Sequence, residues 1–480
     1  MVRRTRACQA CHSRRMRCDE TLPNCTQCLR AGRKCPGPIE GPMIVDVTAQ
    51  TELRARSRPG SSLRRSGNSS TAATTIPSPI SPSQIPSLVQ NFFSHFLDYF
   101  SSRSGGAPGK FWLHELPYMS SPSATSGLEL AVQAVSTVFC ANAASNAEYY
   151  AGSRAMYGQA LQTHSRSVAA LQDSAAPTAQ MLCTTLILGF YEAMSSTQNG
   201  GEGYVRHVEG AAKMVEVLGP EGCGDGLVNE LFFTARTQML LISFLTQQPS
   251  IYATAPYLNI PHLSGSKPVH ERLLDIMTLL VEELHHPSRH QPNHPMRGPA
   301  FMSTVDSRIN DLWTEFHATY YQPLFSLSEP GIGEATHNNN INRDDNYPNA
   351  FTAYITSYFS LARIFFYTII VQQNSLCSPS SSTQIQAQTQ DKYHTRSQGH
   401  DEVMRKEATS IFSCAAYLET QNLGCGFVRE VFPLLVVGMH GVEEDRRAAR
   451  GVLERWRERG VVAGLVGLVI GRLDDLESGR

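Results

Sequence analysis

The chain has 480 residues, of which 41% are hydrophobic and 17% are charged, an ordinary balance for a soluble globular protein of two to four domains. Its formal net charge of -1 hides a strong asymmetry, because residues 1–65 carry a formal charge of +9 and the remainder carries -10. A basic N-terminal segment followed by an acidic remainder predicts that the N-terminal segment binds a polyanionic partner.

Two cellular settings are disfavoured by the sequence. The N-terminus is charged and then rich in cysteine, so it does not resemble a secretory signal. The strongest apolar runs fall short of the ~20 residues of a membrane helix. We therefore expect an intracellular protein with reduced thiols that does not contact a membrane.

Half of the 12 cysteines lie near the N-terminus, in the pattern C-x2-C-x6-C that occurs twice with an offset of 17 residues. Paired C-x2-C motifs in a reducing compartment indicate a metal site, and all-sulfur ligation favours zinc or an iron–sulfur cluster. A structural zinc takes ~4 ligands, so six sulfurs satisfy two zinc ions only if two of them bridge. The repeat indicates the equivalent first cysteines, Cys8 and Cys25, as the bridges. The predicted ligands are Cys8, Cys11, Cys18, Cys25, Cys28 and Cys35.

Two alternatives explain the cluster less well. An iron–sulfur cluster uses ~4 cysteines and leaves two without a role. A disulfide-bonded knot has the right parity but the wrong compartment. The other six cysteines show no ligand spacing and are expected to be small buried or loop residues.

Basic residues between the cysteines differ in the two copies of the repeat. Arg14 and Arg15 in the first copy align with Ala31 and Gly32 in the second, so the first copy is the better candidate for reading a nucleic acid. Arginine binds guanine bidentately and neutralises phosphates, and the module has no aromatic platform for RNA. These features predict a duplex DNA partner over a merely solvated basic face. The predicted contacts are Arg6, His12, Arg14, Arg15, Arg17, Arg33 and Lys34.

Residues 8–35 resemble the fungal Zn2Cys6 binuclear-cluster DNA-binding domain. The resemblance rests on the six cysteines, the basic run before Cys18, Asp19 and Pro23. It implies two zinc ions and a helix after the second cysteine that enters the major groove, usually at CGG-type triplets. The family's key basic pair falls on Arg14 and Arg15. His12 stands where the family usually has arginine.

Between the module (residues 1–38) and the body, residues 39–84 are rich in Gly, Pro, Ser and Thr and are expected to form a disordered linker. The basic string Leu53–Arg65 is a candidate nuclear-import or phosphate-binding patch, which favours a nuclear protein. The linker holds barely one heptad, so it does not predict a coiled coil. Monomeric binding and a homodimer formed through the body both stay open.

Residues 85–480 show apolar residues at helical spacing and no comparable alternating run, which predicts an all-α body. Helices are expected at 85–100, 128–144, 155–172, 176–194, 203–219, 228–245, 269–284, 305–321, 351–370 and 402–419, with two or three more after Gly426. Residues 377–400 are polar and of low complexity, so a disordered insertion is expected there.

Three stretches of the body resemble the fungal transcription-factor regulatory domain: Leu186–Glu192, Tyr204–Pro220 and, more weakly, Phe432–Trp456. The resemblance implies helix packing without catalytic residues, so His207 is interpreted as a packed histidine. It also implies a nuclear regulator of RNA polymerase II genes that works with the transcription machinery. Such bodies often accompany metabolic or secondary-metabolite gene clusters, which is an association only.

Other functions have weaker support in the sequence. The histidine-rich stretch 285–295 is broken by prolines and is interpreted as a solvated loop. Common catalytic motifs are missing, so we expect no enzyme activity. The alternatives are an enzyme with an appended zinc module, and a scaffold or co-regulator whose zinc module binds protein.

Overall fold

The computed structural model divides into two units, residues 1–77 and residues 78–480, which are described separately. In the first unit the described residues are 19, 25–32 and 35. In the second unit they are 93–94, 96–98, 100, 112–119, 126–171, 175–195, 201–263, 265–285, 299–321, 347–376, 386–421, 424–460 and 462–479. The linker predicted at 39–84 lies outside these residues.

The first unit contains one short helix in its described part, α2 (Thr26–Arg30). The second unit is helical throughout its described part, where an isolated bridge between His262 and Gly265 is the one β contact. The all-α body is therefore confirmed for the described residues. Its helices are η1 (Trp112–Glu115), α5 (Leu116–Met119), α6 (Gly127–Ala144), α7 (Ala147–Ala169), α8 (Ala179–Met194), α9 (Glu202–Gly222), α10 (Gly226–Thr246), η2 (Ile251–Ala253), α11 (Ala255–Leu258), α12 (Val269–His285), α13 (Pro299–Tyr320), α15 (Ala350–Leu376), α16 (Gln386–Gln421), α17 (Gly424–His440), α18 (Glu443–Glu458) and α19 (Ala463–Glu477).

Side-chain caps explain several helix starts. Ser126 accepts a hydrogen bond from the Glu129 N–H at 3.1 Å and begins α6. The Asn146 side chain accepts from the N–H groups of residues 148 and 149 and begins α7, eight residues before the expected start at 155. The polar and tyrosine-rich first turns of α7 hide its periodicity, whereas the cap fixes where it begins.

Helix α9 ends its regular part where the sequence predicts. Gly219 has φ 70° and ψ 169°, and Pro220 follows it. The positive φ is readily adopted by glycine alone, and proline cannot continue the hydrogen-bond ladder. Before this break, Tyr204, Val208 and Val215 share the buried face of the helix.

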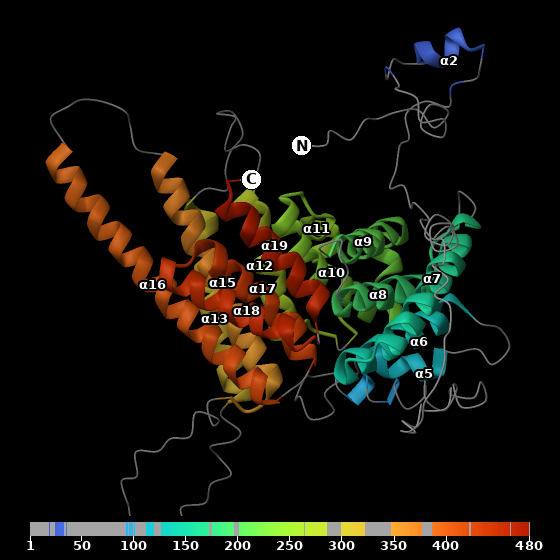
Figure 1. Cartoon of the computed structure of the whole chain (residues 1–480). Coiled ribbons are helices and arrows are strands. Elements are labelled where there is room, and N and C mark those ends of the chain that lie inside the picture. The colour runs from blue at the N-terminus through green and yellow to red at the C-terminus, as the bar shows by residue number, and fades with distance from the viewer. Residues whose placement is uncertain are drawn as a thin grey trace, which may run out of the picture. The chain divides into compact units, whose positions relative to one another are not determined.

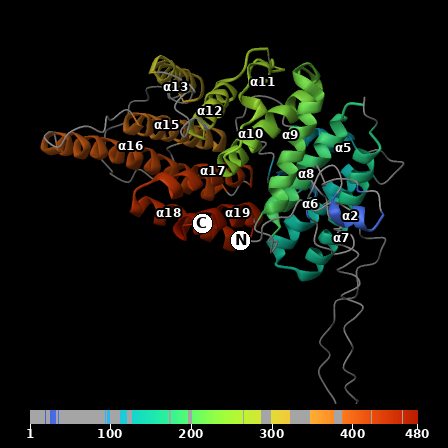
Figure 2. The ribbon, with the colours of Figure 1, turned by 90° about the horizontal axis from the view of Figure 1, so that it is seen from above.

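Two hydrophobic clusters form the core of the second unit. One gathers side chains from the N-terminal segment, α6, α8 and α10, and the other gathers side chains from α10, α12, α13, α15 and the C-terminal helices α17 to α19. Figures 1 and 2 both show α13, α15 and α16 on the opposite side of this unit from α6 and α7, with α10, α12 and α17 between them. Met239 and Val428 pack against both clusters, so α10 and α17 join them.

Helix α15 is a long apolar helix of the body. Its segment Ala350–Gln373 has the length and hydropathy of a membrane-spanning helix, as does α6, but 78% of that segment is buried inside the body. For α6 the buried share is 50%. Core helices of globular proteins have the same composition, and α15 packs against α12, α13, α16 and α17.

The expectation of a disordered insertion at 377–400 is corrected in its second part. Helix α16 begins at Gln386, 16 residues before the expected start at 402, and includes residues 386–400. Residues 377–385 lie outside the described part of the chain. The helical segment "QAQTQDKYHTRSQ" has no proline or glycine and is rich in Gln, which favours helix even where polarity hides the periodicity.

A buried carboxyl in α17 should make stability depend on pH. Burial raises the pKa of Glu430 from 4.5 to about 8, although its Oε1 accepts a hydrogen bond from the Ser357 hydroxyl at 2.6 Å. The folded state therefore binds the proton more tightly than the unfolded state, so the stabilisation is complete below pH 4.5 and is lost as pH rises through 8. We expect the free energy of unfolding to fall by up to ~1.4 kcal/mol per pH unit in that window. Denaturant titrations across pH would measure this slope.

Glu430→Gln provides the matched test, because the amide oxygen keeps the bond from Ser357 and cannot ionise. The variant should not show the fall in the free energy of unfolding between pH 4.5 and pH 8, and it should be more stable than the wild type at pH 8. The variant should still lose stability as the pH falls below 6.5. Burial lowers the pKa of His207 from 6.5 to about 3, so the unfolded state binds this proton before the folded state does. If the free energy of unfolding of the variant fell with pH in this range as steeply as that of the wild type, the assignment to Glu430 would be contradicted.

Candidate metal centre and nucleic-acid interface

Cys25 occupies the N-cap of α2, with the extended backbone (φ -67°, ψ 147°) that this position requires. Its sulfur accepts a hydrogen bond from the Cys28 N–H at 3.4 Å, and its carbonyl accepts from the N–H groups of residues 28 and 29 at 3.0 and 3.1 Å. The C-x2-C spacing thus lets one cysteine cap the helix while the other lies one turn later on its inner face. Cys25 and Cys28 are both buried, whereas Leu29 beside them is 59% exposed.

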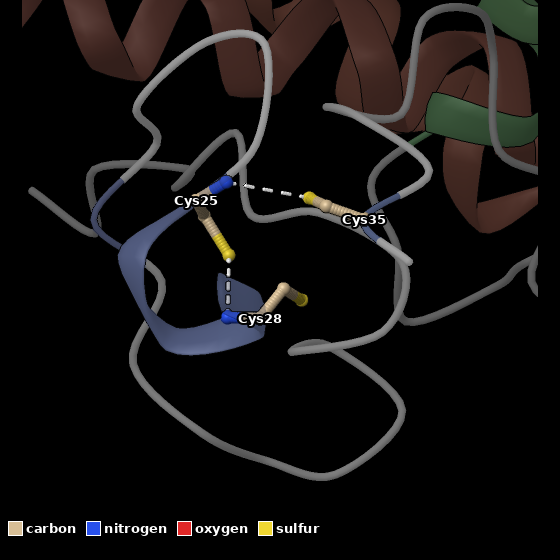
Figure 3. Close-up of side chains that lie close together, drawn as sticks. All are labelled: Cys25, Cys28 and Cys35. Atoms are coloured by element: carbon tan, nitrogen blue, oxygen red, sulfur yellow. Dashed lines mark hydrogen bonds between the residues drawn. The ribbon is translucent and has the colours of Figure 1, made fainter. Parts of the chain in front are cut away.

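Cys35 completes a group of three sulfurs. The Sγ atoms of Cys25, Cys28 and Cys35 all lie within 4.8 Å of one another, and the Cys35 sulfur accepts from the Cys25 N–H at 3.5 Å. Figure 3 shows these two N–H···S contacts and the three side chains converging. Zinc–thiolate bonds of ~2.3 Å in a tetrahedron place sulfurs about 3.8 Å apart. The group therefore fits three corners of a zinc site, and its N–H donors stabilise thiolate sulfur.

Asp19, which directly follows the first copy of the repeat, contacts the beginning of the second copy. Both of its carboxylate oxygens accept from the Thr26 N–H at 3.1 Å. A carboxylate at this point satisfies a free N–H of the first helical turn and interacts favourably with the helix dipole. In the sequence Asp19 is one of the residues that carry the family resemblance. The structure adds that its carboxylate contacts the first turn of α2.

Helix α2 is short because its last turn leads into a left-handed residue. Ala31 is the C-cap and Gly32 has φ 62°, with its N–H donating to the Leu29 carbonyl at 3.1 Å. Arg30, the one basic side chain of α2, is exposed in the last turn. The second copy of the repeat therefore presents little positive charge on its helix.

The remaining predicted site residues lie outside the described part of the chain. For the metal these are Cys8, Cys11 and Cys18, and for DNA they are Arg6, His12, Arg14, Arg15, Arg17, Arg33 and Lys34. Within the described residues, Cys25, Cys28 and Cys35 are the one group of three metal-binding side chains close enough to share an ion.

His207 is a packed histidine, as the sequence suggests. Its Nε2 lies 2.9 Å from the Tyr157 hydroxyl, which in turn donates to Glu192 Oε1 at 2.5 Å. Because that hydroxyl has one hydrogen, Nε2–H of the histidine donates to the tyrosine oxygen. Burial lowers the pKa of His207 to about 3 and raises the pKa of Glu192, so the histidine stays neutral and links α7, α8 and α9.

Comparison with known proteins agrees with this geometry. Residues 6–39 match the fungal Zn(2)-Cys(6) binuclear cluster domain, and residues 88–256 match the fungal specific transcription factor domain. A stretch of 35 residues is 54% identical to the uncharacterized transcriptional regulatory protein YLR278C of Saccharomyces cerevisiae. That match covers 7% of this chain and 3% of the yeast protein. No solved structure is significantly similar to the chain.

The second match includes α7, α8 and α9, where the Tyr157–Glu192–His207 contacts lie. The first match contains the converging cysteines, and the second match covers the N-terminal part of the second unit. The chain therefore carries a Zn(2)-Cys(6) binuclear cluster domain, which binds two zinc ions, at residues 6–39 and a match to the fungal specific transcription factor domain at residues 88–256.

Proposed function

We propose that this protein is a transcription regulator that binds duplex DNA in the nucleus and reads CGG-like triplets at RNA polymerase II genes through the segment after Cys11. The observation that carries the proposal is the convergence of Cys25, Cys28 and Cys35 in a module whose flanks are strongly basic. Its first 65 residues have 14 arginine and lysine residues against five acidic ones, a charge suited to a phosphate backbone.

The metal assignment extends from the three converging sulfurs. Cys25, Cys28 and Cys35 would bind one zinc together with Cys8, and Cys8, Cys11, Cys18 and Cys25 would bind the other. Cys8 and Cys25 are then the bridging ligands, because each begins its copy of the repeat. Six thiolates and two zinc ions carry about -2 together, so the surrounding arginines and lysines keep the surface positive.

The end of α2 supports Arg14 and Arg15 as the reading residues. In the second copy the helix ends before Gly32, whose φ is 62°. The repeat offset places Arg15 at the equivalent position in the first copy, and a residue with a Cβ disfavours that conformation. We therefore expect the first helix to continue past residues 14 and 15 and to present both guanidinium groups on one regular element.

Each part of the chain is assigned one role. Residues 1–38 would read DNA. Residues 39–84 would link this module to the helical body, and their basic string Leu53–Arg65 would support nuclear import. Residues 85–480 would contact the transcription machinery and carry any homodimer interface. Arg6, His12, Arg17, Arg33 and Lys34 would add contacts around the reading pair, mostly to phosphates.

Arg15→Ala is expected to weaken binding to the preferred triplet by ~1–3 kcal/mol and to relax its base preference, because a bidentate contact to guanine is lost. Binding of the full chain to a library of half-sites, with Kd measured at several salt concentrations, checks this. Arg30→Ala is the matched control, since it removes an exposed arginine from the second copy of the repeat.

A uniform loss of affinity across all sequences, with the salt slope reduced by ~0.9, would instead identify Arg15 as a phosphate contact. Wild-type binding that does not change with salt would favour the scaffold alternative, in which the module binds protein.

A further inference from the structure

A cavity of about 190 Å³ lies in the second unit, where the two hydrophobic clusters meet, and it is partly open to solvent. Helices α10, α12, α15 and α17 form most of its wall, and α10, α12 and α17 are seen in the middle of this unit in Figure 2. Seven wall side chains are aromatic, among them Trp112, Phe233 and Phe351. The volume exceeds that of a cavity of ~150 Å³ that accommodates benzene, so the space suits a substituted ring.

The charged side chains of the wall include both signs. Two carboxylates, Glu230 and Glu271, and one guanidinium, Arg429, line the cavity. The Cζ atom of Arg429 lies 4.5 Å from the centroid of the Tyr354 ring. Burial disfavours the charge of Arg429, whereas neighbouring groups that include Glu271 raise its pKa. The protein itself therefore stabilises this guanidinium.

An ion-pair network continues behind Glu271. Its carboxylate pairs with the buried guanidinium of Arg236, Arg236 also pairs with Asp275, and Asp275 pairs with Lys267 at 2.8 Å. Together with the second carboxylate and the guanidinium of the wall, these groups are three carboxylates and three cations, so their formal charges sum to zero. An anionic ligand would face two carboxylates, a cationic ligand would face a guanidinium, and burial of an uncompensated charge is costly. The charges around the cavity therefore favour a neutral ligand.

Two wall residues offer hydrogen-bond acceptors. Gln238 Oε1 and His270 Nδ1 are buried and have no hydrogen-bond partner among the described residues. Burial lowers the pKa of both wall histidines, His262 and His270, and that of His270 to about 4, so both rings are neutral at pH 7. The Nε2 atom of His270 lies 3.5 Å from Glu271 Oε1 and carries the proton toward that carboxylate, which leaves Nδ1 as an acceptor. Buried acceptors without partners are uncommon, and ligand hydroxyl groups can satisfy them.

We propose that this cavity is a binding site for a small, uncharged aromatic compound that carries hydroxyl groups. The ring would pack among the aromatic side chains, and the hydroxyl groups would donate to Gln238 and His270. Such a ligand would contact side chains of both clusters and stabilise their junction. The site belongs to the second unit and does not depend on DNA reading by the first.

The test uses the zinc-loaded full chain and the three isomers of hydroxybenzyl alcohol, which place two hydroxyl groups at different separations on one ring. Calorimetric titration should give a Kd below about 1 mM for at least one isomer, and this isomer should raise the melting temperature. Methylation of both hydroxyl groups should weaken its binding about 10-fold or more, because two hydrogen bonds are lost. The hydroxybenzoate and the hydroxybenzylamine of the same substitution pattern should each bind at least about 10-fold more weakly, because their charges would be buried without compensation.

Two variants assign the binding to the cavity. Gln238→Leu removes one acceptor and should reduce the preference for the alcohol over its dimethyl ether several-fold. Gln180→Leu is the matched control, because Gln180 is exposed on α8 and does not line the cavity. Thr237→Phe places a ring in the cavity and should weaken binding of the alcohol at least about 10-fold. If Thr237→Phe does not fold, Gln238→Leu decides the matter.

The proposal is overturned if no isomer of hydroxybenzyl alcohol binds the wild type, if Gln238→Leu and Thr237→Phe both bind it as the wild type does, or if a charged analogue binds more tightly than the alcohol. Binding of a half-site is measured separately and should be the same for all variants. Failure of the wild type to bind DNA would count against the proposed function, whereas failure of the calorimetric titration counts against the cavity.

Discussion

Removal of zinc is expected to abolish DNA binding while the helical body stays folded. Leu29, one of the few apolar residues of the module, is 59% exposed, so burial of apolar surface contributes little to its folding. Metal binding supplies ~10–16 kcal/mol in comparable zinc-finger peptides, and this free energy is also their folding free energy. Chelation of both ions should therefore weaken specific DNA binding at least ~1,000-fold, to the level of nonspecific contacts. Fluorescence anisotropy with a labelled half-site measures this loss.

Cys28→Ala should reproduce the effect, because it removes a buried sulfur from the converging group. Metal analysis should find fewer than two zinc ions per chain, and added zinc should not restore binding. Cys140→Ala is the matched control, because Cys140 lies in α6 of the other unit and has no ligand spacing. The melting temperature of the body should be unchanged by Cys28→Ala, since Cys28 belongs to the first compact unit and the body to the second. Full zinc content in Cys28→Ala would refute the ligand assignment.

The second large effect is expected at the contact between α8 and α19. A Cβ atom on Gly464 would lie 2.0 Å from the Glu192 carbonyl oxygen and 2.5 Å from the Ser195 carbonyl oxygen. Both obstacles are backbone atoms at the end of α8, so the helices would have to separate. Gly464→Ala should destabilise the body by about 3 kcal/mol, at the upper end of overpacking effects. Thermal unfolding should show a melting temperature lower by roughly 5 °C or more.

Gly467→Ala is the control for this substitution. Gly467 lies one turn further along α19, and a Cβ atom there would meet nothing within 4 Å. Its replacement should stabilise the body by roughly 0.5–1 kcal/mol, because alanine favours helix over glycine. Equal effects at the two positions would show that helix propensity, and not the close approach to α8, controls the outcome.

Residues 8–35 show how much a sequence can predict when the chemistry is local. Zinc imposes a ligand number and a bond length, so six spaced cysteines predict the metal without knowledge of the fold. The structure then confirms that the second C-x2-C begins a short helix and that its cysteines converge with Cys35. Capping of α2 by Asp19 could not be predicted, because it joins residues seven positions apart through a turn that spacing does not define.

Helix periodicity predicted the all-α body because burial of one helix face repeats every few residues along the chain. The same signal failed at the start of α16, where polar residues form helix without an apolar stripe, and at the start of α7, where a cap decides the boundary. Gly464, Arg429 and His270 likewise look ordinary in the sequence. Their importance depends on atoms from other helices.

The amino-acid sequence by itself determined the zinc module, the basic N-terminal segment and the helical class of the body. Each of these depends on ligand spacing, charge or periodicity within one segment. Only the tertiary structure decided that α19 approaches the α8 backbone at Gly464, and that α10, α12, α15 and α17 enclose a cavity lined by Arg429. These features come from the packing of segments far apart in the chain, which no local pattern specifies.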